Sequence, residues 1–257
     1  MLAAVQGPPA ALDSLRQLPH IPEVALAALA CRGWCEVPNY LPQTAVQALW
    51  HDAQLLDEAG LPRHASVGST LRGATAVRRD DDVRVSRMLP LIPPPRNCAG
   101  HVSTRLALAD GMHGLRQQLE GAKQLDVPPI APFATELAYL YYPEGGLYKR
   151  HMDVPAARDG WIPLGRRAED GGSFSRAALR REISMLLYLD AGWDPAWGGH
   201  LRVYEPDGDS ERKTDVIPEG GTLVLMRSDK VPHEVLKTRR PRRCLVGWFR
   251  TSGEWSW

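Results

Sequence analysis

The pattern of apolar and polar positions changes character about halfway along the chain. In the first half, three segments carry apolar residues at helical spacing or nearly all round a helix, and these predict helices over 22–33, 42–60 and 104–121. Two of the segments begin at a proline and all three end at a glycine, the residues that favour helix starts and helix ends. A strand-like piece, 33–42, follows the first helix, whereas 62–100 carries little periodic signal.

After residue 132 the apolar positions follow strand spacing instead. Seven short segments are rich in leucine, β-branched and aromatic residues, and Gly, Pro and Asp turns separate them. These segments are ELAYLYYP, LYKRHMD, EISMLLYLD, HLRVYEP, GTLVLMRS, HEVLK and RRCLVGWFR. Several short strands at close spacing predict a β-sandwich or barrel. With the helices before it, this pattern indicates an α+β fold in one functional unit, divided into 1–134 as a helical support region and 135–257 as the β core.

One segment inside the predicted β core does not look like a strand. Residues 154–182 are charged and glycine-rich, and they lie between two predicted strands. Structureless stretches of this length in compact domains are usually active-site lids or disordered insertions. We therefore expect 154–182 to be a long insertion.

Composition excludes several classes of protein. The 257 residues include 31 basic and 30 acidic side chains, so there is no general attraction to nucleic acid or to acidic membranes. No apolar run is long enough for a membrane-spanning helix, and the first residues lack the basic region of a signal peptide. Four cysteines without a CxxC pair are typical of reduced thiols. We expect a cytoplasmic enzyme with no nucleic-acid or membrane partner.

The first candidate chemistry is the pair His151 and Asp153. Residues two apart on a strand point to the same face, so an imidazole and a carboxylate can bind one metal ion there. A surface histidine beside a solvated aspartate is the ordinary alternative for this pair alone. His233, which precedes a predicted strand, supplies a second imidazole. Two histidines and one carboxylate form the facial triad of non-haem Fe(II) oxygenases, and zinc with a water also accepts this set.

A basic cluster and several tyrosines accompany the three candidate ligands. Arg242 begins a predicted strand nine residues after His233, and a guanidinium fixed in a barrel can bind a carboxylate through two hydrogen bonds. Most charges in such a cluster are solvated, so we expect one of five basic residues to point inward: Lys237, Arg239, Arg240, Arg242 or Arg243. The hydroxyls of Tyr142, Tyr148 and Tyr188 are candidates for the wall of the same pocket, with core packing as the ordinary alternative for each.

The order of these motifs is more specific than any one of them. HxD, a strand that ends in YLD, a tryptophan-rich turn with two glycines, GTLVLMRSD, PHEV and an arginine six residues before Trp248 follow one another over residues 136–252. This order resembles the prolyl-4-hydroxylase branch of the 2-oxoglutarate/Fe(II)-dependent dioxygenases, above all the bacterial and hypoxia-sensing prolyl hydroxylases. More weakly, GWCEVPNYLP and AVRRDDDVR resemble the N-terminal support of that family.

The resemblance implies a double-stranded β-helix (jelly roll) core with supporting N-terminal helices and a metal at one mouth. It implies that three residues bind Fe(II): His151, Asp153 and His233. Arg242, chosen over Arg243 by its spacing from Trp248, would bind the C5 carboxylate of 2-oxoglutarate. Tyr142 and Tyr188 would contact this co-substrate, and Tyr148 would line the substrate side.

The activity that the resemblance implies is hydroxylation of an unactivated C–H with Fe(II), 2-oxoglutarate and O2, releasing succinate and CO2, with ascorbate as a stimulant. The family favours a prolyl residue of a protein or peptide as substrate, and a free amino acid or natural-product small molecule is the alternative. Two departures bear on this choice: Asp190 stands where relatives often have Asn, and 154–182 is longer than usual. Five arginines make the insertion basic, which suits an acidic peptide, an anionic small molecule or a merely solvated loop: Arg166, Arg167, Arg176, Arg180 and Arg181.

Two readings from other classes compete with the oxygenase. A non-catalytic barrel that binds metal or a carboxylate as a sensor or interaction module is disfavoured, because a degenerate copy would be expected to lose at least one member of the intact motif set. A zinc hydrolase with the same triad lacks a separate general base at a motif-like position. The oxygenase is therefore the leading hypothesis.

Overall fold

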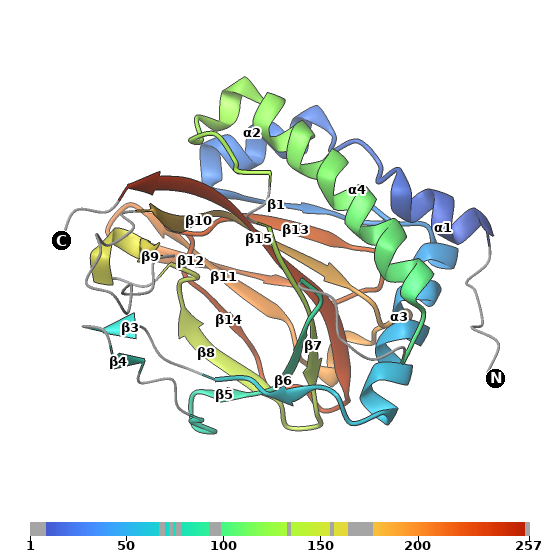
Figure 1. The fold of residues 1–257 in the computed structure, drawn as a ribbon. Helices are drawn as coiled ribbons and strands as arrows, with labels where there is room; N and C mark the ends of the chain where they lie inside the picture. The colour runs from blue at the N-terminus through green and yellow to red at the C-terminus, as the bar shows by residue number, and fades with distance from the viewer. Residues whose placement is uncertain are drawn as a thin grey trace, which may run out of the picture.

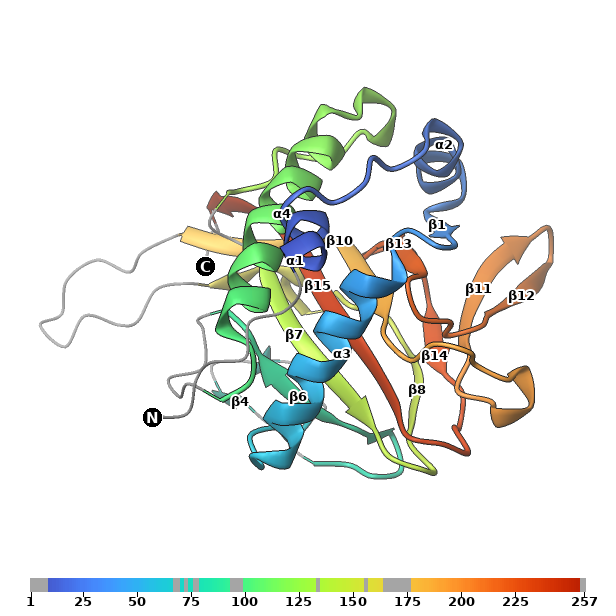
Figure 2. The same ribbon diagram turned by 90° about the vertical axis from the view of Figure 1, so that its right-hand side faces the viewer.

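Two antiparallel β-sheets lie face to face, and helices cover the outer face of the larger sheet (Figures 1 and 2). This computed structural model describes residues 9–66, 70–71, 74–75, 79–92, 99–132, 135–154, 157–163 and 177–254. The arrangement is the predicted α+β architecture with a jelly-roll core, and the prediction is confirmed. Among the described residues, no helix is long and apolar enough to cross a membrane.

The larger sheet combines strands from both halves of the chain. Its order is β1 (Trp34–Val37), β13 (Leu223–Arg227), β10 (Ala177–Tyr188), β15 (Arg242–Glu254), β7 (Glu136–Tyr142), β6 (Arg87–Pro90) and β2 (Arg63–His64), and β9 (Ile162–Pro163) also pairs with β10. The smaller sheet has the order β12 (Ser210–Val216), β11 (Leu201–Asp207), β14 (His233–Val235), β8 (Leu147–His151) and β5 (Arg84–Val85). A separate two-stranded ribbon pairs β3 (Thr70–Leu71) with β4 (Ala74–Thr75).

The helices form one layer against the larger sheet. They are α1 (Pro9–Arg16), α2 (Glu23–Arg32), α3 (Gln43–Glu58) and α4 (Val102–Gly121). Three short 3-10 turns lie later in the chain: η1 (Lys123–Leu125), η2 (Ala157–Gly160) and η3 (Pro195–Trp197). The helices α2, α3 and α4 confirm the three predicted from sequence, whereas α1 was not predicted. Helix α2 ends as expected, because Gly33 adopts a left-handed φ of 82° and its N–H bonds to the carbonyl of Leu29.

Alternation along the central strands produces two separate apolar cores. On β10, Met185 and Leu187 pack among the helices, whereas Leu186 and Tyr188 face the smaller sheet. The same period of two holds along β7, β13 and β15. A slip of one residue would exchange the two sets, so the register of the sheet determines which side chains line the space between the sheets.

The strand β10 differs from the sequence prediction at its start. It begins at Ala177, so residues 177–182 belong to a strand and not to the expected insertion. Arg180 and Arg181 therefore lie on the sheet, and their assignment to a basic lid was wrong. The other three arginines of that lid, Arg166, Arg167 and Arg176, lie outside the described residues, as does Cys98. Of the remaining cysteines, all three have free thiols: Cys35 and Cys244 are buried, whereas Cys31 is exposed.

Candidate metal centre

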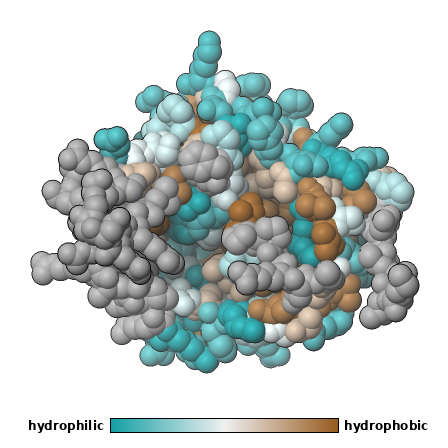
Figure 3. All heavy atoms as spheres, in the orientation of Figure 1, coloured by the Kyte–Doolittle hydropathy of each residue, from teal (hydrophilic) through white to brown (hydrophobic). Residues whose placement is uncertain are grey.

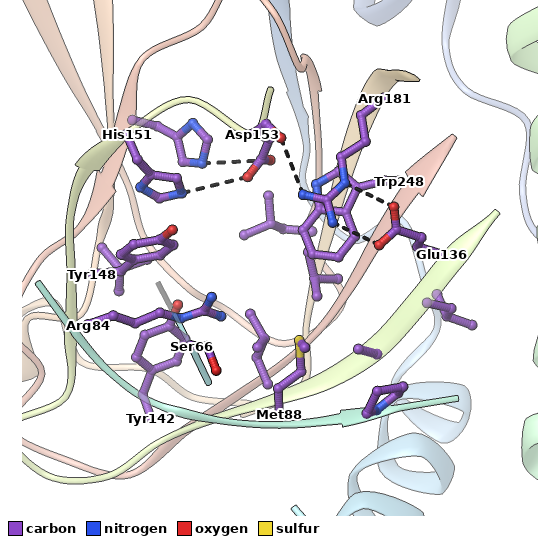
Figure 4. Close-up of a pocket in the computed structure, with 18 of the residues that line it drawn as sticks. Ser66, Arg84, Met88, Glu136, Tyr142, Tyr148, His151, Asp153, Arg181 and Trp248 are labelled. Atoms are coloured by element: carbon purple, nitrogen blue, oxygen red, sulfur yellow. Dashed lines mark hydrogen bonds and ion pairs between the residues drawn. The ribbon is translucent and has the colours of Figure 1, made fainter. Parts of the chain in front are cut away.

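Three predicted ligands meet at one end of the smaller sheet. His151 ends β8 and His233 begins the neighbouring strand β14, where the two residues are register partners, and Asp153 follows two residues after His151. Their ligand atoms all lie within 4.8 Å of one another. The Asp153 carboxylate oxygens lie 3.7 Å from Nε2 of His151 and 3.9 Å from Nε2 of His233 (Figure 4). The three side chains thus converge on one point from one side, as a facial metal site requires.

Backbone hydrogen bonds orient both imidazoles. Nδ1 of His151 lies 2.8 Å from the carbonyl oxygen of Lys149, and Nδ1 of His233 lies 3.0 Å from the carbonyl oxygen of Val231. A carbonyl oxygen only accepts, so each Nδ1 is the protonated nitrogen. With Nδ1 as the donor, the neutral form of each ring has its lone pair on Nε2, the nitrogen that faces Asp153, and this is the tautomer that a metal ligand needs.

The electrostatics of the cluster favour the protonation states that bind a metal. Burial alone would raise the pKa of Asp153, but the neighbouring His151, His233 and Arg181 side chains hold this pKa well below its usual range. Burial, with a smaller contribution from His151, lowers the pKa of His233 to about 4. At neutral pH Asp153 is therefore ionised and His233 is neutral, so neither must lose a proton to bind a metal ion.

Arg181 supports Asp153 from the larger sheet, a contact that sequence reasoning missed. Its Nη1 donates to the main-chain carbonyl of Asp153 at 3.2 Å, and its Nε and Nη2 donate to the Glu136 carboxylate at 3.0 and 2.7 Å. The guanidinium also lies 3.8 Å from the ring of Trp248 (Figure 4). Strand spacing would have placed Arg181 on the face of Ile183 and Met185, among the helices. A β-bulge between Arg181 and Ile183 turns it to the pocket instead.

Arg242 is the predicted inward-pointing arginine. Its side chain is fully buried, and its Nε, Nη1 and Nη2 have no hydrogen-bond partner among the described residues. The guanidinium lies 5.0 Å from the ring centroid of Tyr142 and 5.0 Å from that of Tyr188. A buried guanidinium without a partner is costly, and its planar fork matches a carboxylate. The site therefore fits a bound carboxylate that lies between the sheets.

Arg243 is occupied elsewhere. Its backbone N–H and its Nη1 both bond to the Asp190 carboxylate, the latter at 3.2 Å, and its guanidinium lies 4.7 Å from the ring of Trp50. Nε1 of Trp50 donates to the same carboxylate at 2.9 Å. Asp190, a departure from the family pattern, thus compensates the positive charge of Arg243. Through its hydrogen bond from Trp50 it also connects the larger sheet to α3. The geometry favours Arg242 over Arg243 as the free carboxylate-binding group.

A pocket of about 300 Å³ between the sheets contains the three candidate ligands. Tyr148 lines it and stacks on His151, with ring centroids 3.6 Å apart. Tyr142 lines it as well, whereas Arg84 and Met88 are wall residues that the sequence analysis did not propose. On the face drawn in Figure 3 the surface is hollowed near its middle, and hydrophilic residues lie inside the hollow.

Comparisons with known proteins agree with this geometry. Residues 137–250 match the model of the 2OG-Fe(II) oxygenase superfamily. A crystal structure of a Pseudomonas putida prolyl-4-hydroxylase has 28% sequence identity and a TM-score of 0.63, and the match covers 90% of this chain and 98% of that one. A Trichoplax adhaerens prolyl hydroxylase, solved with a hypoxia-inducible factor peptide fragment, has 20% identity and a TM-score of 0.64 over 88% and 86% of the two chains.

A more distant neighbour shows the same fold. The epimerase SnoN, solved with Fe3+ and alpha ketoglutarate, has 15% identity and a TM-score of 0.54 over 97% of this chain and 88% of that one. None of the curated proteins matches this sequence significantly. The family model, the prolyl hydroxylase neighbours and the His-Asp-His cluster agree on the cofactors, which are Fe(II) and 2-oxoglutarate. The chain carries a 2OG-Fe(II) oxygenase domain and is a 2-oxoglutarate-dependent dioxygenase.

Proposed function

We propose that this dioxygenase hydroxylates an unactivated C–H of a prolyl residue in a protein or peptide. Two observations carry the proposal: an open-faced His-Asp-His cluster in the pocket, and a buried Arg242 that has no hydrogen-bond partner among the described residues. Tyr142 connects them, because it lines the pocket and its ring lies 5.0 Å from the Arg242 guanidinium. The prolyl substrate is supported by the Pseudomonas putida enzyme, which matches almost end to end, and by the neighbour solved with a peptide fragment. A free amino acid or another small molecule is the competing substrate class.

In this proposal His151, Asp153 and His233 bind Fe(II) on one face. Nε2 of each histidine and a carboxylate oxygen are the ligand atoms, and the backbone hydrogen bonds at Nδ1 hold both rings in place. When bound with 2-oxoglutarate and O2, iron supplies the oxidising chemistry that turns a C–H into a hydroxyl group while succinate and CO2 are released. Arg181 acts as a positioning residue, because it fixes the main chain at Asp153.

Arg242 holds the co-substrate by its far carboxylate. Its fork would bind that group in the inter-sheet core, where the rings of Tyr142 and Tyr188 each lie 5.0 Å from the guanidinium. The hydroxyl of Tyr188 is buried and also lacks a partner among the described residues, so it can donate to the same carboxylate. Fixing the far end orients the keto-acid end toward the candidate metal. Tyr148, stacked on His151, lines the substrate side.

An anaerobic titration tests the cofactor roles. Fe(II) and 2-oxoglutarate together are expected to give a weak visible charge-transfer band that neither gives alone. Proline-containing peptides, with ascorbate added, are then expected to raise succinate formation and to gain one oxygen atom by mass spectrometry. A band without peptide hydroxylation would reject the prolyl substrate, and absence of the band would reject the assigned cofactor residues.

A further inference from the structure

Arg84 is a pocket residue to which the activity above gives no role. It lies on β5, where it is the register partner of Tyr148 on β8. Its Nε donates to the Ser86 hydroxyl at 2.8 Å, and its guanidinium lies 4.5 Å from the centroid of the Tyr148 ring. Tyr148 lies between Arg84 and His151 in Figure 4. A hydrogen bond at one end and an aromatic face along its length thus hold the guanidinium at the pocket wall.

Among the described residues, no acidic side chain forms an ion pair with Arg84 to compensate its positive charge. The nearest arginines along the chain differ in this respect, because Arg79 pairs with Asp81 at 2.6 Å and Arg87 pairs with Asp57. Across the pocket, Glu136 compensates Arg181. Arg84 is therefore a pocket arginine that keeps an uncompensated charge.

Binding of the co-substrate would leave this charge in place. The two carboxylates of 2-oxoglutarate offset Arg242 and the single net positive charge of Fe(II) bound to Asp153. Arg242 is fully buried and presents its whole fork, so the far carboxylate has a complete partner without Arg84. Arg84 lines the pocket and is only partly buried, so a bound molecule can reach it more readily than the fully buried Arg242. A cation held in a half-buried pocket attracts a complementary anion.

We infer that Arg84 binds a carboxylate of the substrate, next to the C–H that is hydroxylated. The inference rests on the proposed function and adds that the substrate is anionic. The carboxylate has two chemical sources: the acidic side chain of a residue beside the prolyl target in a peptide, or the α-carboxylate of a free imino acid. Both present the same planar group to the guanidinium fork, and the experiment separates them.

The test uses pairs of compounds that differ only in the carboxylate. Peptides with Asp or Glu beside proline are compared with their Asn or Gln counterparts, and free L-proline is compared with L-prolinamide. Succinate formation and the anaerobic change of the charge-transfer band are measured for the wild type and for Arg84→Gln, Arg84→Lys and Arg202→Gln. Arg202 is the matched control, because it also lies on the smaller sheet but pairs with Asp215 on the surface.

In at least one pair we expect the wild type to favour the carboxylate member by about ten-fold in kcat/KM, the effect of one charge-assisted hydrogen bond. Arg84→Gln should abolish this preference, Arg84→Lys should keep part of it, and Arg202→Gln should keep all of it. The inference is overturned if no carboxylate member is preferred, or if Arg84→Gln raises the KM for 2-oxoglutarate and leaves the preference intact. A wild type without the band would instead reject the proposed function.

Discussion

His151 and His233 are register partners on the adjacent strands β8 and β14, although more than eighty residues separate them in the sequence. Their ring centroids lie 4.3 Å apart, and each ring is fixed by the main-chain carbonyl two residues before it. The spacing of the two imidazoles is therefore set by strand pairing. A site built on a sheet in this way is preorganised, so the protein need not rearrange its strands to bind a metal.

Removal of a proposed ligand is expected to abolish Fe(II) binding and substrate-dependent succinate formation. The variants are His151→Ala, Asp153→Ala and His233→Ala, each of which deletes one of only three protein ligands. Iron content after anaerobic loading and succinate release measure the two effects. His113→Ala, on the exposed face of α4, is the control. Wild-type rates in any of the three variants, with iron supplied, would remove that residue from the site.

Arg242 is expected to be needed by the co-substrate but not by the fold. In Arg242→Met the buried guanidinium without a partner is replaced by an apolar side chain, so the Tm of the protein without ligands should stay the same or rise. The KM for 2-oxoglutarate should increase by about a hundred-fold, because a two-pronged charged interaction is lost. Thermal unfolding measures the Tm, and initial rates of succinate formation at varied 2-oxoglutarate measure the KM. A large fall in Tm with an unchanged KM would mean that Arg242 is structural.

Glu136 is expected to act on the metal site through Arg181. Glu136→Gln weakens the ion pair that holds Arg181 against the carbonyl of Asp153, so Fe(II) affinity should fall by about 10-fold to 100-fold, as for other supporting partners of ligands. Competition with a chelator measures the affinity. Glu211→Gln is the matched control, because Glu211 also makes a two-pronged pair, with Arg150, but on the surface. An equal loss of Fe(II) affinity in Glu136→Gln and Glu211→Gln would contradict a positioning role for Glu136.

The ligand set could be predicted from sequence, but strand spacing supplied only part of it. A period of two grouped His151 with Asp153, although β8 ends at His151 and Asp153 lies just beyond the strand. His233 was added because two histidines and a carboxylate form a facial triad and because the motif order resembles a known family.

Arg242 was identifiable among five basic residues by its spacing from Trp248. Its burial could not be derived from sequence, because it depends on Tyr142 and Tyr188, which come from two other strands.

The residues that the sequence analysis missed have a physical reason in common. Arg84 lies on a strand of two residues, too short for any period to be detected, and its place in the pocket comes from pairing with β8. Arg181 lies in a charged run that was assigned to the insertion, yet Glu136 and Trp248 compensate its burial from neighbouring strands. In both cases contacts between distant segments override the local signal.

An ion pair between Glu205 and Arg32, away from the site, makes the stability of the fold depend on pH. Glu205 on β11 accepts two hydrogen bonds of 2.8 Å from Arg32, the last residue of α2. These bonds lower the pKa of Glu205 from 4.5 to about 2. A carboxyl group whose pKa is lower in the folded state stabilises the protein above its unfolded pKa. That contribution is lost as the pH falls through the folded pKa.

Glu205→Gln should therefore lower the free energy of unfolding by about 2 kcal/mol at pH 7, the value typical of a hydrogen bond to a charged group. The difference in the free energy of unfolding between the variant and the wild type should start to shrink once the pH falls below 4.5, the ordinary carboxyl pKa. It should vanish at about pH 2, the folded-state pKa. Urea unfolding across this pH range measures it, with Glu211→Gln as the control for loss of one carboxylate. A difference between wild type and Glu205→Gln that stays constant from pH 7 to pH 2 would show that packing, and not the ionised pair with Arg32, is what Glu205 contributes.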